Sequence, residues 1–364
     1  MKINKKLENR PFFSEFESPI TEKHHIYYKI SSKIFERNNI DKDIKYVLPL
    51  KTCFDYDSFV VSCEEKDYIL KISLDATNNA IVSESLFYRN NKDLSICSLV
   101  DCGVIKIGDE ISFLLVENDL GFDLYDLGAS YVLDNLFGFF VTFMNQRKFV
   151  SDQSVEDYID KLINEVDINK LSESSKSDIK VYQDLDHLCR VLDDITSNLL
   201  KLKSKELFKS YDFCHGGLDF DNLTSLDGLF KFCNYENSFY GNQIIDLSIM
   251  CLNLGYQERD FNYVCRQYCK INGLDYEAKK TEIRECLELS CNIHLCKLIY
   301  SFVIEQCVYK NSREDRITYL VRNFFETSWC LDISGSSTWV IEFLNEMFSI
   351  PVDFDKELRE KYSE

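Results

Sequence analysis

The sequence predicts an α+β fold in two lobes, in which a small lobe rich in antiparallel β-strands precedes a large and mainly helical lobe. Short apolar runs separated by turn residues occupy residues 46–116, whereas apolar residues recur at helical spacing over most of residues 129–348. The chain has 364 residues, of which 45% are hydrophobic, and this is enough for a substantial core and for two domains or lobes.

The first lobe is expected to span residues 25–118 and to follow an irregular arm at residues 1–24. The turn residues Glu64-Glu65-Lys66 separate two of its apolar runs and indicate an antiparallel meander. The predicted order is a helix at 25–38, strands at 46–50, 58–63 and 67–73, a helix at 77–91, and strands at 98–105 and 111–116.

The second lobe is expected to span residues 119–364 and to be helical except in the segment 211–248. That segment predicts strand, polar loop, hairpin, strand, polar loop and helix, an order that can deliver side chains from several loops to one point. A ligand would then lie in the cleft between the lobes. Helices are predicted at 130–148, 154–165, 178–205, 244–254, 258–271, 276–310 (with a break near Cys291 to His294), 313–328 and 336–348.

The composition excludes several classes of partner. Lys and Arg number 42 and Asp and Glu number 61, which gives a formal charge of −19, so neither nucleic acid nor an anionic membrane is expected as a partner. The sequence contains no apolar run long enough to span a membrane and no signal-peptide pattern. Its 15 cysteines form no CxxC pair and indicate a reducing, cytoplasmic location.

Three motifs in the central segment follow one another at defined separations: HGGLDFDN from His215 to Asn222, Asn234-Tyr235-Glu236, and GNQIIDL from Gly241 to Leu247. Together with the two-lobe plan they resemble the catalytic loop, the metal-binding motif and the helix-start motif of the aminoglycoside phosphotransferase and choline kinase family. That family has the protein-kinase-like fold. The resemblance covers about residues 40–350 and implies ATP and Mg²⁺ as cofactors and a small hydroxylated molecule as substrate.

The resemblance also assigns residues to the nucleotide. Lys71 would hold the phosphates and pair with Glu84, and adenine would bond the backbone near Glu117 and Asn118. Without the later motifs, Lys71 would equally fit an exposed strand position and Glu84 a solvated helix face. The metal would be held by Asn222, Asn234 and Glu236.

Two residues depart from the family pattern. Gly217 stands where the family has the carboxylate that orients and deprotonates the attacking hydroxyl, and Asn234 stands where it has the aspartate that binds magnesium. Losing a base or a main charge-stabilising group typically costs on the order of several kcal/mol in barrier. Asp219 and Asp221 are either substitutes for the missing carboxylates or solvated loop acids.

Other candidate residues are interpreted as structural. His215 is expected to hydrogen-bond beneath the loop, and Asp246 to tie the loop to the following helix. The loop expected over the phosphates, residues 53–58, has no glycine, and its acids Asp55 and Asp57 would repel a triphosphate. The remaining candidate metal ligands, Cys286, Cys291, His294 and Cys296, are spaced over diverging helix faces and are interpreted as core residues.

Two hypotheses of function follow. The first is a catalytically inactive phosphotransferase-like protein, a pseudokinase, that acts as a binding or structural component with an unidentified protein partner. The second is an active ATP-dependent phosphotransferase that uses displaced acids on a small hydroxylated substrate, with a cationic one favoured by the acidic chain. A third hypothesis is that the protein is a subunit of a larger assembly and uses its N-terminal arm as a clamp on that assembly.

Overall fold

A computed structural model defines most of the first 299 residues of the chain. It describes residues 20–21, 23, 25–40, 43–52, 56–64, 66–73, 79–91, 98–118, 122–123, 127–171, 173, 176–177, 185–208, 212–218, 222–226 and 228–299. The helices predicted at 313–328 and 336–348, the first 19 residues of the arm, and both Asp219 and Asp221 lie outside the described residues.

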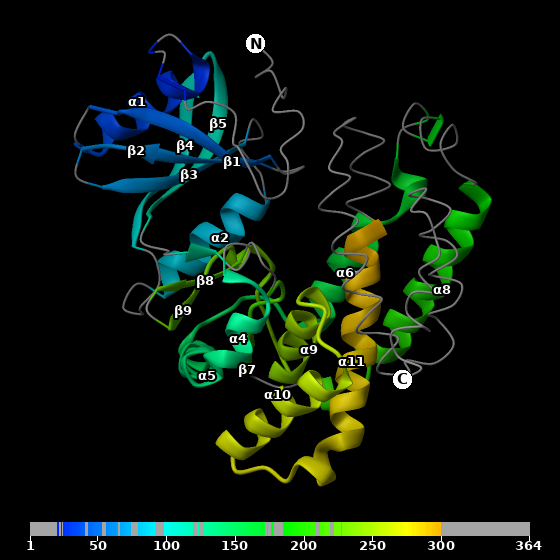
Figure 1. Cartoon of the computed structure of the whole chain (residues 1–364). Coiled ribbons are helices and arrows are strands. Elements are labelled where there is room, and N and C mark those ends of the chain that lie inside the picture. Colours follow the sequence, from blue (N-terminus) through cyan, green and yellow to red (C-terminus); the bar gives the residue numbers. More distant parts are fainter. Residues whose placement is uncertain are drawn as a thin grey trace, which may run out of the picture.

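A five-stranded antiparallel sheet forms the centre of the N-terminal lobe, as predicted (Figure 1). Its strand order is β1-β2-β3-β5-β4, so the first three strands form a meander and the last two pair as a hairpin beside β3. The strands are β1 (Tyr46–Thr52), β2 (Asp57–Ser62), β3 (Asp67–Ser73), β4 (Leu99–Ile107) and β5 (Asp109–Glu117).

The two faces of this sheet pack against different helices. Helix α1 (Ile26–Arg37) covers one face, where its buried side chains form a core cluster with Leu70 and Ile72 of β3. Helix α2 (Asn79–Asn90) lies on the other side, and Ile69 belongs to the cluster that continues into the helical lobe. Since strand residues alternate between faces, Lys71 points to the same side as Ile69, toward α2 and the helical lobe.

The helical lobe is built around α9 (Gln243–Asn253), every residue of which is buried. Helix α11 (Tyr276–Ile299) runs along it and also contacts α6 (Val155–Glu165) and α8 (Leu185–Lys203) (Figure 1). The other helices described in this lobe are α4 (Ser130–Asp134), α5 (Leu136–Asn145), η1 (Gln146–Lys148), η2 (Ile168–Lys170), η3 (Glu206–Phe208), η4 (Tyr235–Asn237) and α10 (Glu258–Ile271).

Two helix predictions need correction. The predicted break near Cys291 to His294 is wrong, because α11 continues without interruption to Ile299. No Gly or Pro interrupts this stretch, and Asn292 is accommodated by donating its side-chain N–H to the carbonyl of Glu288. The predicted single helix at 130–148 is divided into α4, α5 and η1. Helix α4 ends at Asp134, because the φ of −116° at Asn135 is not helical.

The cysteines and the histidine of α11 are core residues, as predicted. Cys286, Cys291, His294 and Cys296 are all buried. Within the described part of the chain, no group of three or more His, Cys, Asp or Glu side chains is arranged to hold a metal ion. Among the same residues, no helix is both long enough and apolar enough to cross a membrane.

The buried His294 predicts a pH dependence of stability. Burial lowers the pKa of His294 from 6.5 to about 3, so the folded chain keeps this side chain neutral while the unfolded chain protonates it below pH 6.5. The stability that His294 contributes is therefore complete above pH 6.5 and is lost as the pH falls. Between pH 7 and pH 5 the native protein should lose about 2 kcal/mol more unfolding free energy than a His294→Leu variant.

Denaturant unfolding of both proteins at the two pH values measures this difference. Other titrating groups, such as Asp246, whose pKa burial raises to about 7, cancel in the comparison. Equal losses in the two proteins would contradict the assignment to His294.

Candidate functional site

The three motifs meet beneath the N-terminal sheet. Strand β7 (Asp212–Cys214) pairs with β10 (Phe239–Gly241), and β8 (Leu223–Leu226) pairs with β9 (Leu229–Phe232) and with β6 (Phe122–Asp123). These pairings place the loop that follows β7 beside the turn that follows β9. The third motif begins α9, where the side chain of Asn242 accepts a hydrogen bond from the N–H of Ile244 at 3.0 Å.

Two buried side chains hold the loop that follows β7. The carboxylate of Asp246 accepts hydrogen bonds from the backbone N–H groups of His215 and Gly216, the second at 2.8 Å. The Nε2 atom of His215 lies 2.8 Å from the carbonyl oxygen of Cys233, at the end of β9. A Cβ at position 216 would lie 2.1 Å from the carbonyl oxygen of Asn237, and its φ is +76°, so only glycine fits.

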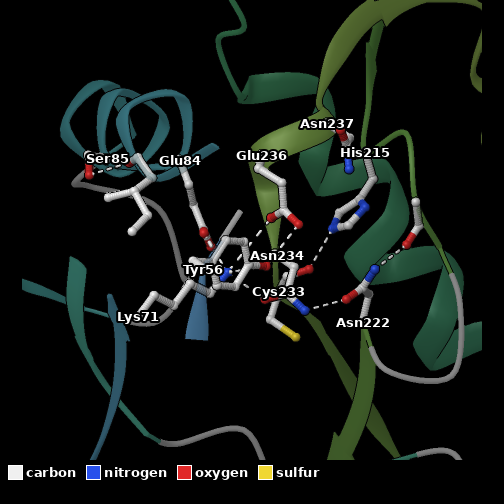
Figure 2. Close-up of polar contacts among 12 residues, drawn as sticks. Tyr56, Lys71, Glu84, Ser85, His215, Asn222, Cys233, Asn234, Glu236 and Asn237 are labelled. Atoms are coloured by element: carbon white, nitrogen blue, oxygen red, sulfur yellow. Dashed lines mark hydrogen bonds and ion pairs between the residues drawn. The ribbon is translucent and has the colours of Figure 1, made fainter. Parts of the chain in front are cut away.

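Lys71 is the centre of the site. Its side chain is 5% exposed, so the alternative of an exposed strand lysine is wrong. Its ammonium lies 2.5 Å from Glu84 Oε2, 2.7 Å from Asn234 Oδ1 and 3.7 Å from Glu236 Oε2 (Figure 2). Burial by itself lowers the pKa of Lys71, but the two carboxylates outweigh it and raise that pKa, so the ammonium stays charged.

Asn234 links Lys71 to the loop. An ammonium has only donors, so the Asn234 atom that faces Lys71 is the amide oxygen, and the amide nitrogen is left to donate to Asn222 Oδ1. Asn222 in turn donates to the carbonyl oxygen of Gly217 at 2.6 Å. Asn234 adopts a φ of +65°, a left-handed conformation that Asn tolerates better than most residues.

These contacts decide whether the residues fit Mg²⁺. The three residues predicted to hold the metal are brought together, but Asn234 Oδ1 faces Lys71 and Asn222 Oδ1 faces Asn234. The carboxylate of Glu236 accepts a hydrogen bond from the hydroxyl of Tyr56 at 3.1 Å and lies near Lys71. Mg²⁺ takes oxygen ligands in octahedral geometry, with carboxylates, phosphates and water as its main partners. Here both amide oxygens accept hydrogen bonds and the one carboxylate is paired, so this donor set does not fit Mg²⁺.

Tyr56 is a site residue that the sequence did not reveal. It lies directly before β2 and is buried, with the Lys71 ammonium 4.8 Å from its ring centroid and 3.5 Å from its hydroxyl (Figure 2). Through Glu236 it joins the two lobes. The signal was an aromatic residue next to the predicted phosphate loop, but its partner stands 180 positions later in the chain.

Of the two acids expected to face the phosphates, Asp55 and Asp57, the structure describes only Asp57. The side chain of Asp57 accepts a hydrogen bond from the Tyr27 hydroxyl of α1 at 3.3 Å, so it points to the opposite face of the sheet from Lys71. The predicted repulsion of a triphosphate by Asp57 is therefore wrong. Asp55 lies outside the described residues.

The residues predicted to contact adenine lie at the end of β5. The N–H of Glu117 donates to the carbonyl of Ser98 at 3.0 Å, and the N–H of Asn118 donates to that of Asp67 at 2.9 Å. The Glu117 carboxylate pairs with Lys66 at 2.9 Å. Both backbone donors are thus used within the lobe.

The position of the missing base is surrounded by nitrogen atoms. A Cβ at Gly217 would lie 3.5 Å from Asn222 Nδ2, 3.8 Å from Lys297 Nζ and 3.9 Å from His215 Nδ1. Lys297 comes from α11 and donates to the carbonyl of Gly216 at 2.6 Å. Lys297 was not predicted as a site residue, because a single lysine in the apolar run LCKLI does not report a contact 81 positions away.

Comparison with solved structures gives the fold. Aminoglycoside phosphotransferase APH(4)-Ia, solved as a thermostable mutant with ADP and hygromycin B, matches with a TM-score of 0.55 at 11% identity, over 84% of this chain and 99% of its own. Choline kinase LicA from Streptococcus pneumoniae matches with a TM-score of 0.54 at 14% identity, over 83% and 98%. The fold is that of the aminoglycoside and choline phosphotransferases.

A third structure supports the same phosphotransferase fold. Amicoumacin kinase hAmiN, in complex with AMP-PNP, Ca²⁺ and Ami, matches with a TM-score of 0.51 at 17% identity, over 82% of this chain and 91% of its own. The sequence matches no family model and no curated protein. The predicted two-lobe kinase-like fold is therefore confirmed by structural similarity.

Removing the buried cation should destabilise this fold strongly. A Lys71→Met variant leaves the carboxylates of Glu84 and Glu236 without their ammonium, which should cost about 3–5 kcal/mol of unfolding free energy. Lys66→Met is the matched control, because Lys66 pairs with Glu117 at the surface and its loss should cost less than about 1 kcal/mol. Denaturant unfolding measures both, and equal effects would contradict the central role of Lys71.

Proposed function

We propose that this protein is a ligand-binding or scaffolding protein with a phosphotransferase fold, which does not catalyse metal-dependent phosphoryl transfer. The observation that carries the proposal is the side chain of Asn234, which bonds Lys71 through its oxygen and Asn222 through its nitrogen. The residues that would hold phosphates and metal in a phosphotransferase are bonded to one another instead.

The charge around Lys71 supports the proposal. One ammonium lies within 4 Å of two carboxylates, from Glu84 and Glu236, so the three groups together carry a formal charge of −1. A triphosphate needs cations to offset its own charge, and phosphoryl transfer depends on that neutralisation. Here the lysine is already neutralised, and the donor set does not fit the divalent ion that would supply the rest.

The position of the base supports the same conclusion. Gly217 has no side chain to accept a proton, and the nearest side-chain atoms around its Cβ position are nitrogens. His215 has its pKa lowered to about 4, mainly by burial, and its Nε2 atom is held by Cys233. Of the described side chains nearest this position, a substrate hydroxyl would meet nitrogen atoms and no carboxylate.

A second candidate is an active phosphotransferase in which Asp219 or Asp221 takes over the missing role. The observation in its favour is the Lys71–Glu84 pair, which is formed and buried as a nucleotide site requires. Its substrate would be a small hydroxylated, cationic molecule of the aminoglycoside or choline type. In the first candidate, an unidentified protein partner uses the same fold as a platform.

Nucleotide binding distinguishes the two candidates. Addition of ATP with Mg²⁺ should stabilise the native protein no more than ATP alone, because the residues at positions 222, 234 and 236 do not fit the metal. Thermal unfolding at saturating nucleotide measures this. A magnesium-dependent gain above about 1 kcal/mol, or transfer of the γ-phosphate to a small alcohol or amine, would favour the active enzyme.

Restoring the carboxylates should restore metal binding. The double variant Gly217→Asp/Asn234→Asp should acquire a Mg²⁺-dependent rise in unfolding temperature in the presence of ATP, since an anionic oxygen then faces the phosphates. Asn237→Asp is a matched control, because it adds a carboxylate to η4, directly after Asn234, at a side chain that contacts Lys161 instead. A response in the control equal to that of the double variant would show that added charge alone is responsible.

A further inference from the structure

The absent side chain at position 217 leaves a defined notch, which we call the Gly217 notch and which is lined by Asn222, Lys297 and His215. Their nitrogen atoms lie 3.5–3.9 Å from the position that a Cβ would occupy, which is ordinary van der Waals distance and leaves room for an atom there. Gly217 is buried and Lys297 is half-buried.

The polar atoms of the notch define the group that it can hold. Lys297 brings a cation with N–H donors, and Asn222 Nδ2 is also a donor. Among the described residues, His215 Nδ1 has no hydrogen-bond partner although its side chain is fully buried. Since Nε2 donates its proton to the carbonyl of Cys233, Nδ1 carries a lone pair and accepts. The described residues thus line the notch with one ammonium, one amide donor and one acceptor.

A carboxyl group with one proton matches this set. One oxygen accepts from the ammonium and the amide, and the other shares the proton with His215 Nδ1. A carboxylate beside a protonated imidazole contains the same single proton, so both descriptions fit the notch. The side chain of aspartate beyond Cα is an acetate unit, and the Cβ position at Gly217 is open, so the methyl carbon of acetate would stand where that Cβ would.

We propose that the Gly217 notch binds the carboxyl group of a small acidic ligand, together with one proton, in the place of the aspartate side chain that this chain lacks. The ligand class is therefore a carboxylic acid. This goes beyond the proposed function and does not rest on it, because the notch requires neither nucleotide nor metal.

The charges near His215 determine how the proton is held. Burial lowers the pKa of His215, and the cations of Lys297 and Lys71 lower it further, whereas Glu236 raises it. A carboxylate in the notch adds a negative charge opposite Nδ1 and raises the pKa again. Among the described residues, the charged groups that act on the His215 ring are Lys71 of β3, Glu236 of η4 and Lys297 of α11, while Asp246 of α9 bonds the backbone N–H of His215.

Acetate is the probe that tests the proposal. In calorimetric titrations of the native protein, sodium acetate should bind saturably, while sodium chloride at the same ionic strength should not. The affinity should tighten as the pH falls from 7.5 to 5.5, by up to about tenfold per pH unit, because one proton enters with the anion. Absence of acetate binding at both pH values would overturn the proposal, and so would binding of inorganic phosphate in preference to acetate.

Three variants locate the binding site. Gly217→Asp supplies a tethered carboxylate and should abolish the acetate response, and Lys297→Met should weaken it at least about tenfold by removing the cation. Lys205→Met removes the same charge elsewhere, from a pair with Glu285, and should leave the acetate affinity unchanged. If Gly217→Asp fails to fold, Lys297→Met still decides. An undiminished response in Lys297→Met, or an equal loss in Lys205→Met, would overturn the assignment to the notch.

Discussion

The buried ammonium of Lys71 is the constraint on which the interface between the lobes depends. A charge taken out of water needs partners, and breaking a buried pair by removing one of them is far more costly than losing a surface pair. The partners come from two places along the chain: Glu84 on α2, and Asn234 and Glu236 after β9. Aromatic packing joins the same two elements: Phe87 of α2 stacks on Tyr235, and their ring centroids are 4.0 Å apart.

That constraint competes with the chemistry usual for the fold. In a working phosphotransferase, a lysine and the metal ligands are directed at phosphates. Here an amide at position 234 can accept from Lys71 and donate to Asn222 at the same time, which a carboxylate cannot do because it has no donor. The substitution therefore does more than remove a metal ligand: it closes a hydrogen-bonded chain that gives the site a structural use.

The sequence predicted the fold well because its strongest signals were local or were repeated. Turn residues and alternation located the strands, and three motifs at defined separations located the site. The pairing of Lys71 with Glu84 came from the resemblance alone, since neither position was distinctive by itself. Tyr56 and Lys297 were missed because their contacts connect residues 180 and 81 positions apart, which no local pattern reports. The side to which Asp57 points depended on Tyr27, another distant residue.

The two departures from the family pattern act on opposite ends of the site. At the end near Lys71, two carboxylates and one ammonium leave an excess of negative charge, which disfavours an uncompensated phosphate. At the other end, the loss of a carboxylate at position 217 leaves Lys297 beside a buried acceptor, His215 Nδ1. The carboxyl group that we propose for the Gly217 notch would therefore be attracted at the end that holds Lys297 and repelled at the end near Lys71.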